Sequence, residues 1–221
     1  MNALDKPSAY ALRCARMVER LRLMGIKSEH VLDAMHRTPR HLFVEEALRS
    51  RAYDDLSLPL GAGQTISQPY TVAKMTELLC GDALQMPRKV LEIGTGCGYQ
   101  TAVLERAGIH EIYSIERIRD LHEIAKRNLR AARCVRSRLK CGDGYLGLPV
   151  AAPFAGIIVT AAPKEVPLAL LNQLAVGGRM VLPLDEGGKQ FLWLIEKLPD
   201  GFRETCIQEA NFVPLVNGSR D

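Results

Sequence analysis

A glycine-rich turn is the part of the sequence best suited to bind a ligand. Residues 90–93 form an apolar run, and Gly94, Gly96 and Gly98 follow it before a helical pattern begins near Tyr99. Glycines let the backbone approach a ligand closely, and the first turn of a helix leaves N–H groups unpaired. The pattern predicts a strand, a tight turn and a helix, with a nucleotide-like ligand bound on the turn.

The spacing of the glycines argues against NAD as that ligand. Dinucleotide-binding turns carry G-x-G-x-x-G, and the place of the third glycine is taken here by Tyr99. S-adenosylmethionine has no pyrophosphate, so its site needs a close-fitting floor for the methionine and the ribose rather than a nest for an anion. An NAD-linked oxidoreductase is therefore the weaker alternative.

Acidic residues follow the next two predicted strands. The run EIYSIE ends in Glu116, twenty-two residues after Gly94, and an acidic side chain at such a strand end accepts hydrogen bonds from ribose hydroxyls. The turn CGDG at residues 141–144 places Asp143 after a further strand, where it is positioned to accept from an adenine amino group. In this order, the glycine turn and the two acids predict a cofactor that contains a nucleoside.

Short apolar runs alternate with amphipathic helical patterns from residue 89 onward. Such alternation predicts an α/β, Rossmann-like fold with a mostly parallel central sheet, helices on both faces and right-handed crossovers. We expect VPLALLNQLAVGG to be helical, and FLWLIEKL and ETCIQEANFVPLV to be closing strands.

The N-terminal part has a different pattern. Residues 9–50 carry helical periodicity broken by Pro39, which predicts two or three short helices, the second capped by Ser28. Residues 53–69 are rich in proline and glycine and are expected to form a loop, followed by a helix that ends near Gly81.

The chain contains no internal repeat or low-complexity linker. We therefore expect one domain over residues 1–221. In it, residues 1–88 form the N-terminal helices and the active-site loop, and residues 89–221 form the Rossmann-like core with its C-terminal strands.

Composition excludes several classes of function. The 221 residues are 47% hydrophobic and 24% charged, as in globular proteins, and the net charge is only +4 with basic and acidic residues interspersed. We therefore expect no nucleic-acid partner, and no apolar run approaches the roughly 18–20 residues that span a bilayer. The six cysteines form no C-x-x-C pair or zinc-site spacing, and no signal segment precedes them. We expect a cytoplasmic monomer without a metal.

Segments spread along the chain from about residue 17 resemble the protein-L-isoaspartate O-methyltransferase family in order and spacing. The segment GQTISQPY is the most family-specific, because many methyltransferases share the glycine turn. The segments are PRHLFV (39–44), GQTISQPY (63–70), VLEIGTGCGYQTAVL (90–104), IERI (115–118), GDGYLGLP (142–149), IIVTAAP (157–163), LLNQLAVGGRMVLPL (170–184) and FVPLV (212–216).

The resemblance implies a class I methyltransferase fold. It also implies transfer of a methyl group from S-adenosylmethionine to the α-carboxylate of L-isoaspartyl residues in damaged proteins and peptides, where the ester then collapses to a succinimide and so begins repair. An α-carboxyl has a pKa of about 3.3–3.7 and is ionised at neutral pH, so no strong base is needed. The enzyme's task is to orient the carboxylate and exclude water from it.

The resemblance assigns catalysis to Ser67, whereas the residues alone favour a turn or cap role for it. Asn211 stands where the family usually has arginine. Cys97 stands where the family often has serine, and we interpret it either as a small residue that fills space or as a thiol sensitive to oxidation. The predicted cofactor-binding residues are Gln64, Thr65, Ile66, Glu92, Gly94, Thr95, Gly96, Gly98, Glu116, Asp143 and Gly144.

Two alternatives stay open within the same fold. One is a class I methyltransferase acting on a small molecule or RNA, which would share the glycine turn and Glu116 but not GQTISQPY. The other is a non-catalytic module that binds the cofactor without turnover.

Overall fold

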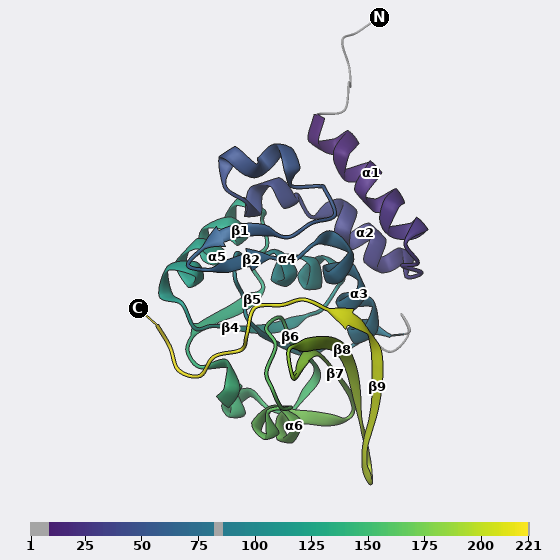
Figure 1. The fold of residues 1–221 in the computed structure, drawn as a ribbon, viewed down its shortest axis with the longest axis vertical. Helices are drawn as coiled ribbons and strands as arrows, with labels where there is room; N and C mark the ends of the chain where they lie inside the picture. The colour runs from purple at the N-terminus through teal and green to yellow at the C-terminus, as the bar shows by residue number, and fades with distance from the viewer. Residues whose placement is uncertain (1–8, 82–85, 221) are drawn as a thin grey trace, which may run out of the picture.

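A seven-stranded sheet forms the centre of the computed structural model, which describes residues 9–81 and 86–220. The strand order is β5-β4-β3-β6-β7-β8-β9; the pairs from β5 to β7 are parallel, and β8 and β9 are added antiparallel (Figure 1). The mostly parallel sheet of the predicted Rossmann-like fold is therefore confirmed. The strands are β3 (Lys89–Ile93), β4 (Glu111–Glu116), β5 (Ser137–Cys141), β6 (Phe154–Val159), β7 (Leu174–Glu186), β8 (Lys189–Leu198) and β9 (Gly201–Ala210).

Helices cover both faces of this sheet, as predicted (Figure 1). Alternation within β3 shows why: Val90 packs in the cluster that holds Leu79 and Leu104, whereas Leu91 packs in the cluster that holds Leu170 on the opposite face. The flanking elements are α3 (Pro69–Cys80), α4 (Tyr99–Arg106) and α5 (Arg119–Ala131) on one face, and α6 (Leu168–Gln173) with the 3-10 helices η4 (Gly144–Leu146) and η5 (Pro149–Ala151) on the other.

The chain changes direction along the sheet next to β3. It runs outward from β3 to β4 and β5, and then returns to the other side of β3 as β6. In open α/β sheets a ligand crevice forms at such a switch point, beyond the carboxyl ends of the strands. The glycine turn after β3 and the residues after β4 and β6 all lie at this edge.

An N-terminal layer, defined as residues 9–66, packs on the helices of one face (Figure 1). Ser28 caps its second helix as predicted, because its side chain accepts a hydrogen bond from the Val31 N–H. The layer consists of α1 (Ala9–Leu23), α2 (Glu29–Arg37), the 3-10 helices η1 (Arg40–Phe43) and η2 (Glu46–Arg51), and the strands β1 (Leu58–Gly61) and β2 (Gln64–Ile66).

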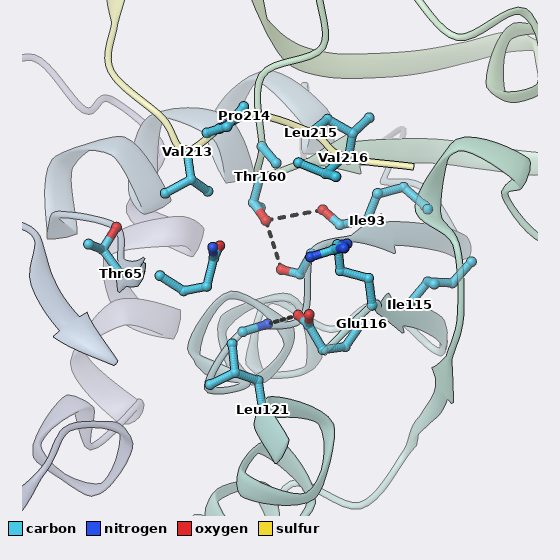
Figure 2. Close-up of a pocket in the computed structure, with 16 residues that line it drawn as sticks. Thr65, Ile93, Ile115, Glu116, Leu121, Thr160, Val213, Pro214, Leu215 and Val216 are labelled. Carbon is cyan, nitrogen blue, oxygen red and sulfur yellow. Dashed lines mark hydrogen bonds between the residues drawn. The ribbon is translucent and has the colours of Figure 1, made fainter. Parts of the chain in front are cut away.

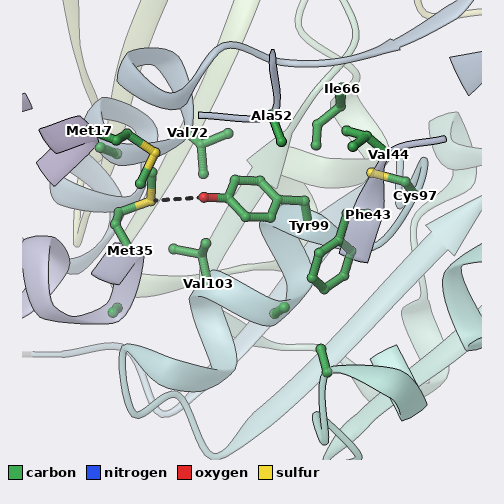
Figure 3. Packing of buried hydrophobic residues seen from close by; sticks show 14 of the residues in the cluster. Met17, Met35, Phe43, Val44, Ala52, Ile66, Val72, Cys97, Tyr99 and Val103 are labelled. Carbon is green, nitrogen blue, oxygen red and sulfur yellow. Dashed lines mark hydrogen bonds between the residues drawn. The ribbon is translucent and has the colours of Figure 1, made fainter. Parts of the chain in front are cut away.

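The layer and the core share one hydrophobic cluster, centred on Tyr99 (Figure 3). The Tyr99 ring lies edge-on to Phe43 with 5.5 Å between ring centres, and its hydroxyl points to the Met35 sulfur at 3.8 Å. Val72 of α3 and Val103 of α4 complete the surroundings. A core that crosses from one part of the chain to the other supports our proposal of a single domain.

Three local predictions differ from the structure. The expected loop at residues 53–69 contains a two-stranded antiparallel hairpin, because Leu58 and Leu60 are buried and Leu58 pairs with Ile66. The expected helix of VPLALLNQLAVGG is limited to the six residues of α6, and its second half enters β7. The last expected strand ends at Ala210, and FVPLV crosses the sheet edge outside any strand.

No helix within residues 9–81 and 86–220 is long and apolar enough to cross a bilayer.

We expect Met35→Ala to lower the free energy of unfolding by about 2–5 kcal/mol, because the Met35 side chain is completely buried in the shared cluster. The matched variant Met24→Ala, at a residue that is 43% exposed, should change it by less than about 0.5 kcal/mol. Urea unfolding followed by circular dichroism measures both. Equal effects would contradict the packing of the N-terminal layer on the core.

Candidate active site

The first cavity lies at the carboxyl ends of β3 and β4 and, together with the solvent-open space at its mouth, has a volume of about 690 Å³. In Figure 2 the chain segment with Val213 to Val216 lies on one side of it, and Glu116 and Leu121 lie on the opposite side. Of the predicted cofactor residues, the cavity is lined by Gln64, Thr65, Gly94, Gly96, Glu116 and Gly144.

Glu116 joins the glycine turn to the start of α5. One carboxylate oxygen accepts from the Gly96 N–H at 2.8 Å, and the other accepts from the Ile118 N–H at 2.9 Å. Each oxygen keeps a second lone pair, because a carboxylate has about four acceptor positions. Since the side chain also lines the cavity, Glu116 is placed to accept from hydroxyls of a bound ligand.

Thr160 follows β6 and closes the glycine turn from the other side (Figure 2). Its hydroxyl lies 2.7 Å from the Gly94 carbonyl oxygen and 3.1 Å from that of Ile93. A Cβ at Gly94 would lie 2.4 Å from this hydroxyl, and Gly94 has φ +94°, so the position requires glycine. Thr160 was not among the residues predicted from the sequence, although it lies in the family-like segment IIVTAAP.

A C-terminal strap, defined as residues 211–220, runs across the sheet edge in yellow in Figure 1. The Ala162 N–H donates to the Val213 carbonyl, and the Leu215 N–H donates to the Ala162 carbonyl, both at 2.8 Å. These bonds lay Val213 to Val216 along the first cavity. The family-like segment FVPLV signalled this contact, but its apolar pattern was interpreted as a strand.

Asp143 holds the strap instead of lining the cavity. One carboxylate oxygen accepts from the Tyr145 N–H and the other from the Gly218 N–H, both at 2.8 Å. The neighbouring Gly144 does line the cavity, and a Cβ there would lie 2.4 Å from the Ile93 side chain. The adenine contact of Asp143 stays a prediction, and its present partners indicate a role in fixing this wall.

Glu92 lies beneath the glycine turn and lines neither the first nor the second cavity. It is completely buried, and one of its oxygens accepts from the Thr101 hydroxyl at 2.5 Å and the Ser114 hydroxyl at 2.6 Å. Ser114 also bonds the Thr95 hydroxyl at 2.6 Å. Burial raises the pKa of Glu92 to about 7, against the lowering effect of the two hydroxyls. Glu92 is thus placed to support the turn from below.

The second cavity, of about 410 Å³, adjoins the first across the glycine turn. It contains Ser67, together with the predicted residues Ile66 and Thr95. Four residues line both cavities, namely Thr65, Gly94, Gly96 and Thr160.

Ser67 also opens onto a third cavity of about 790 Å³. Asn211 lines this cavity together with Thr71 of α3 and Gln208 of β9. Ser67 therefore stands between the smaller cavity beside the glycine turn and a larger one, and Asn211 lines the larger one.

Gly98 and Cys97 belong to the packing of the turn. Gly98 has φ +88°, and a Cβ there would lie 3.1 Å from the Leu129 side chain. Burial raises the pKa of the Cys97 thiol to about 11, so it stays protonated at neutral pH, which favours a space-filling role. Gly98 lines none of the three cavities, and its predicted cofactor contact stays a prediction.

In the described part of the chain, no three histidine, cysteine or acidic side chains are grouped so that they could hold a metal ion. Most of the side chains that line the first cavity are apolar, and the charged ones among them are those of Glu116 and Arg117. This arrangement suits a ligand that has both apolar parts and hydroxyl groups, and Ser67 lines the adjoining cavity.

Comparisons with known proteins agree with this site. The family model described as Protein-L-isoaspartate(D-aspartate) O-methyltransferase matches residues 13–220. A protein-L-isoaspartate O-methyltransferase of Chromobacterium violaceum is 59% identical over 203 residues, which cover 92% of this chain and 90% of the relative. One of Dechloromonas aromatica is 54% identical over 206 residues, covering 93% and 94%.

Solved structures share the fold. A structure named protein-L-isoaspartate O-methyltransferase matches with a TM-score of 0.81 and 31% identity over 90% of this chain, which spans 65% of that longer chain. A Plasmodium falciparum chain solved with S-adenosyl-L-homocysteine matches with a TM-score of 0.79 and 22% identity, covering 92% and 98%. The chain therefore belongs to the protein-L-isoaspartate O-methyltransferase family.

Proposed function

We propose that the protein transfers a methyl group from S-adenosylmethionine to the α-carboxylate of L-isoaspartyl residues in damaged proteins. The observation that carries the proposal is the pair of adjoining cavities, which share Thr65, Gly94, Gly96 and Thr160. One cavity has the acidic and apolar lining that suits the cofactor, and the other presents the Ser67 hydroxyl to an acceptor. Its relatives in the family carry the name of this activity.

The residues of the first cavity fit S-adenosylmethionine. Glu116 is only 5% exposed and has free lone pairs for two ribose hydroxyls, and Gly96 has φ +53° with only the Leu60 methyl near its missing Cβ, at 3.7 Å. Ile115 and Leu215 offer apolar walls for a purine ring. When bound, the cofactor supplies a methyl group activated by a positively charged sulfur.

The acceptor needs orientation more than activation. Its α-carboxylate is already ionised at neutral pH, so Ser67 has only to donate a hydrogen bond to one oxygen and leave the other directed toward the shared boundary. Apolar neighbours such as Ile66 and Met75 exclude water from the second cavity. The hollow beside Ser67 that Asn211 lines gives the rest of the acceptor chain space to leave.

We further infer that the enzyme works as a monomer in the cytoplasm. Its six cysteines are all free, which supports a reducing compartment.

Methyl transfer to an isoaspartyl peptide tests the proposal. We expect the wild-type protein to methylate the peptide and to ignore its normal aspartyl isomer. Ser67→Ala should lower kcat about 10- to 100-fold, because the carboxylate loses its orienting donor. Labelled methyl incorporation gives the rates, and calorimetry should show that the affinity for S-adenosylmethionine is unchanged.

The control is Ser50→Ala, which removes an exposed hydroxyl in η2 and should leave the rate unchanged. Methylation of RNA or a small molecule in place of the peptide would support a different class I methyltransferase. Cofactor binding without turnover on any acceptor would support a binding module. Full activity of Ser67→Ala would move the acceptor contact to backbone groups of the same loop.

Glu116→Ala should weaken S-adenosylmethionine binding about 10- to 100-fold, because it removes charge-assisted hydrogen bonds worth about 1.5–3 kcal/mol. Glu123→Ala, which removes a carboxylate of α5 that is 53% exposed, should leave the affinity unchanged. Titration calorimetry on both folded variants measures this. Equal affinities would show that Glu116 does not bind the cofactor.

Glu92→Gln should alter the pH dependence of stability. The folded pKa of about 7 lies above the ordinary 4.5, so the folded state keeps a proton that the unfolded state has lost, and wild-type stability falls as pH rises from about 4.5 through 7. The Gln variant should therefore gain about 2–3 kcal/mol over wild type between pH 5 and 8. Urea unfolding at both pH values measures the gain, and parallel curves would contradict the burial of Glu92 in its neutral form.

A further inference from the structure

Arg40 is a buried cation with no role in the methyl transfer as proposed above. It is completely buried in η1. Its Nε donates to the Ala52 carbonyl at 2.7 Å, and its Nη2 donates to the Ser67 carbonyl at 2.8 Å. The guanidinium carbon lies 4.6 Å from the centre of the Tyr99 ring. The Arg40 side chain thus links Ala52, which follows η2, with Ser67, which lies between β2 and α3, and with Tyr99, the first residue of α4.

The charge of Arg40 has no direct counterion. Within the described part of the chain, no carboxylate forms an ion pair with it, and its Nη1 has no hydrogen-bond partner. Burial lowers the pKa of the guanidinium, and Tyr99, Cys97 and the more distant Asp55 oppose this lowering, while a guanidinium stays protonated in proteins. An unpaired positive charge therefore lies one hydrogen bond away from Ser67.

The positive charge of Arg40 lies close to the cavities in which the acceptor is proposed to bind, because Ser67 lines them. Ser67 lines the second and third cavities, and its carbonyl is held from the protein interior by Arg40. Fixing the carbonyl restricts the adjacent peptide plane, and with it the position of the Ser67 Cα from which the hydroxyl extends. In a site of low dielectric constant, the nearby positive charge also favours an anion over a neutral group.

We propose that Arg40 is a positioning residue for methyl transfer, which orients Ser67 through its carbonyl and favours the negative charge of the acceptor carboxylate. The proposal rests on the proposed function, because it requires a carboxylate acceptor at Ser67. Only a planar guanidinium holds the Ala52 and Ser67 carbonyls together while it stacks on Tyr99; the ammonium of lysine keeps the charge but not this geometry.

Two variants of Arg40 separate geometry from charge. Arg40→Met removes both, and should lower kcat about 10- to 100-fold and raise KM for an isoaspartyl peptide severalfold. Arg40→Lys keeps the charge, and should restore KM to within twofold of wild type while kcat stays reduced. In both variants the dissociation constant for S-adenosylmethionine, measured by calorimetry, should stay within twofold.

The control is Thr38→Val, which removes a buried hydrogen bond to the Ala34 carbonyl in the same layer without touching Ser67. It should lower stability but leave kcat and KM of the folded enzyme unchanged. A purely structural role of Arg40 predicts that its variants behave in the same way.

Rates are given per folded enzyme, with the folded fraction taken from circular dichroism. Wild-type kcat and KM in Arg40→Met would overturn the proposal. If that variant does not fold, Arg40→Lys decides: wild-type kcat in it, or failure of both variants to fold, would assign Arg40 to stability alone. A wild-type protein that methylates no isoaspartyl peptide would instead overturn the proposed function, and this inference with it.

Discussion

The contact between Arg40 and Tyr99 is the interaction on which the arrangement of the site depends. Tyr99 is the first residue of the helix that follows the glycine turn, and Arg40 belongs to the N-terminal layer, which Ser67 directly follows in the chain. The Arg40 guanidinium lies 4.6 Å from the centre of the Tyr99 ring, whose hydrophobic surroundings Figure 3 shows, and this contact holds the second cavity in place relative to the first. A shift of about 1 Å between acceptor and cofactor is enough to slow a transfer by about 100-fold. The tyrosine that replaces a dinucleotide-type glycine is therefore also the anchor for the acceptor side.

Buried polar side chains also hold the glycine turn in place through hydrogen bonds. Glu116 holds the Gly96 N–H, Thr160 holds the Gly94 carbonyl, and Glu92 holds the hydroxyls below the turn. Burial of such groups costs free energy unless they are hydrogen-bonded. These hydrogen bonds keep the glycine turn in its binding conformation before the ligand arrives, so less free energy is lost in ordering the turn when the ligand binds.

Much of this architecture could be predicted from the sequence. The alternating runs after residue 89 predicted the parallel sheet and its helices, and chain order alone placed Glu116 beside the glycine turn. The orientation of Glu92 was harder, because it depends on the pleat: Glu92 shares a face with Val90 and meets Thr101 of α4, while Ile93 lines the cavity. The hairpin at residues 58–66 was not predicted, because its proline and glycines are typical of a loop.

Other features depend on contacts between distant segments. The C-terminal strap has the composition of a strand, but hydrogen bonds to Ala162 and Asp143 hold it across the sheet edge. Nothing near Arg40 in the sequence indicates that its side chain reaches Ser67, twenty-seven residues away. Motifs thus indicated the chemistry, whereas the fold determined which residues support it.

A crystal structure with S-adenosylhomocysteine and an isoaspartyl peptide would test most directly the claim that the two cavities hold cofactor and acceptor. We expect the ribose hydroxyls to lie on Glu116 in the first cavity. We expect the peptide carboxylate beside Ser67 in the second cavity, with the cofactor sulfur directed to the boundary formed by Thr65, Gly96 and Thr160. A cofactor without contact to Glu116, or an acceptor carboxylate that reaches the sulfur by a path away from Ser67, would contradict it.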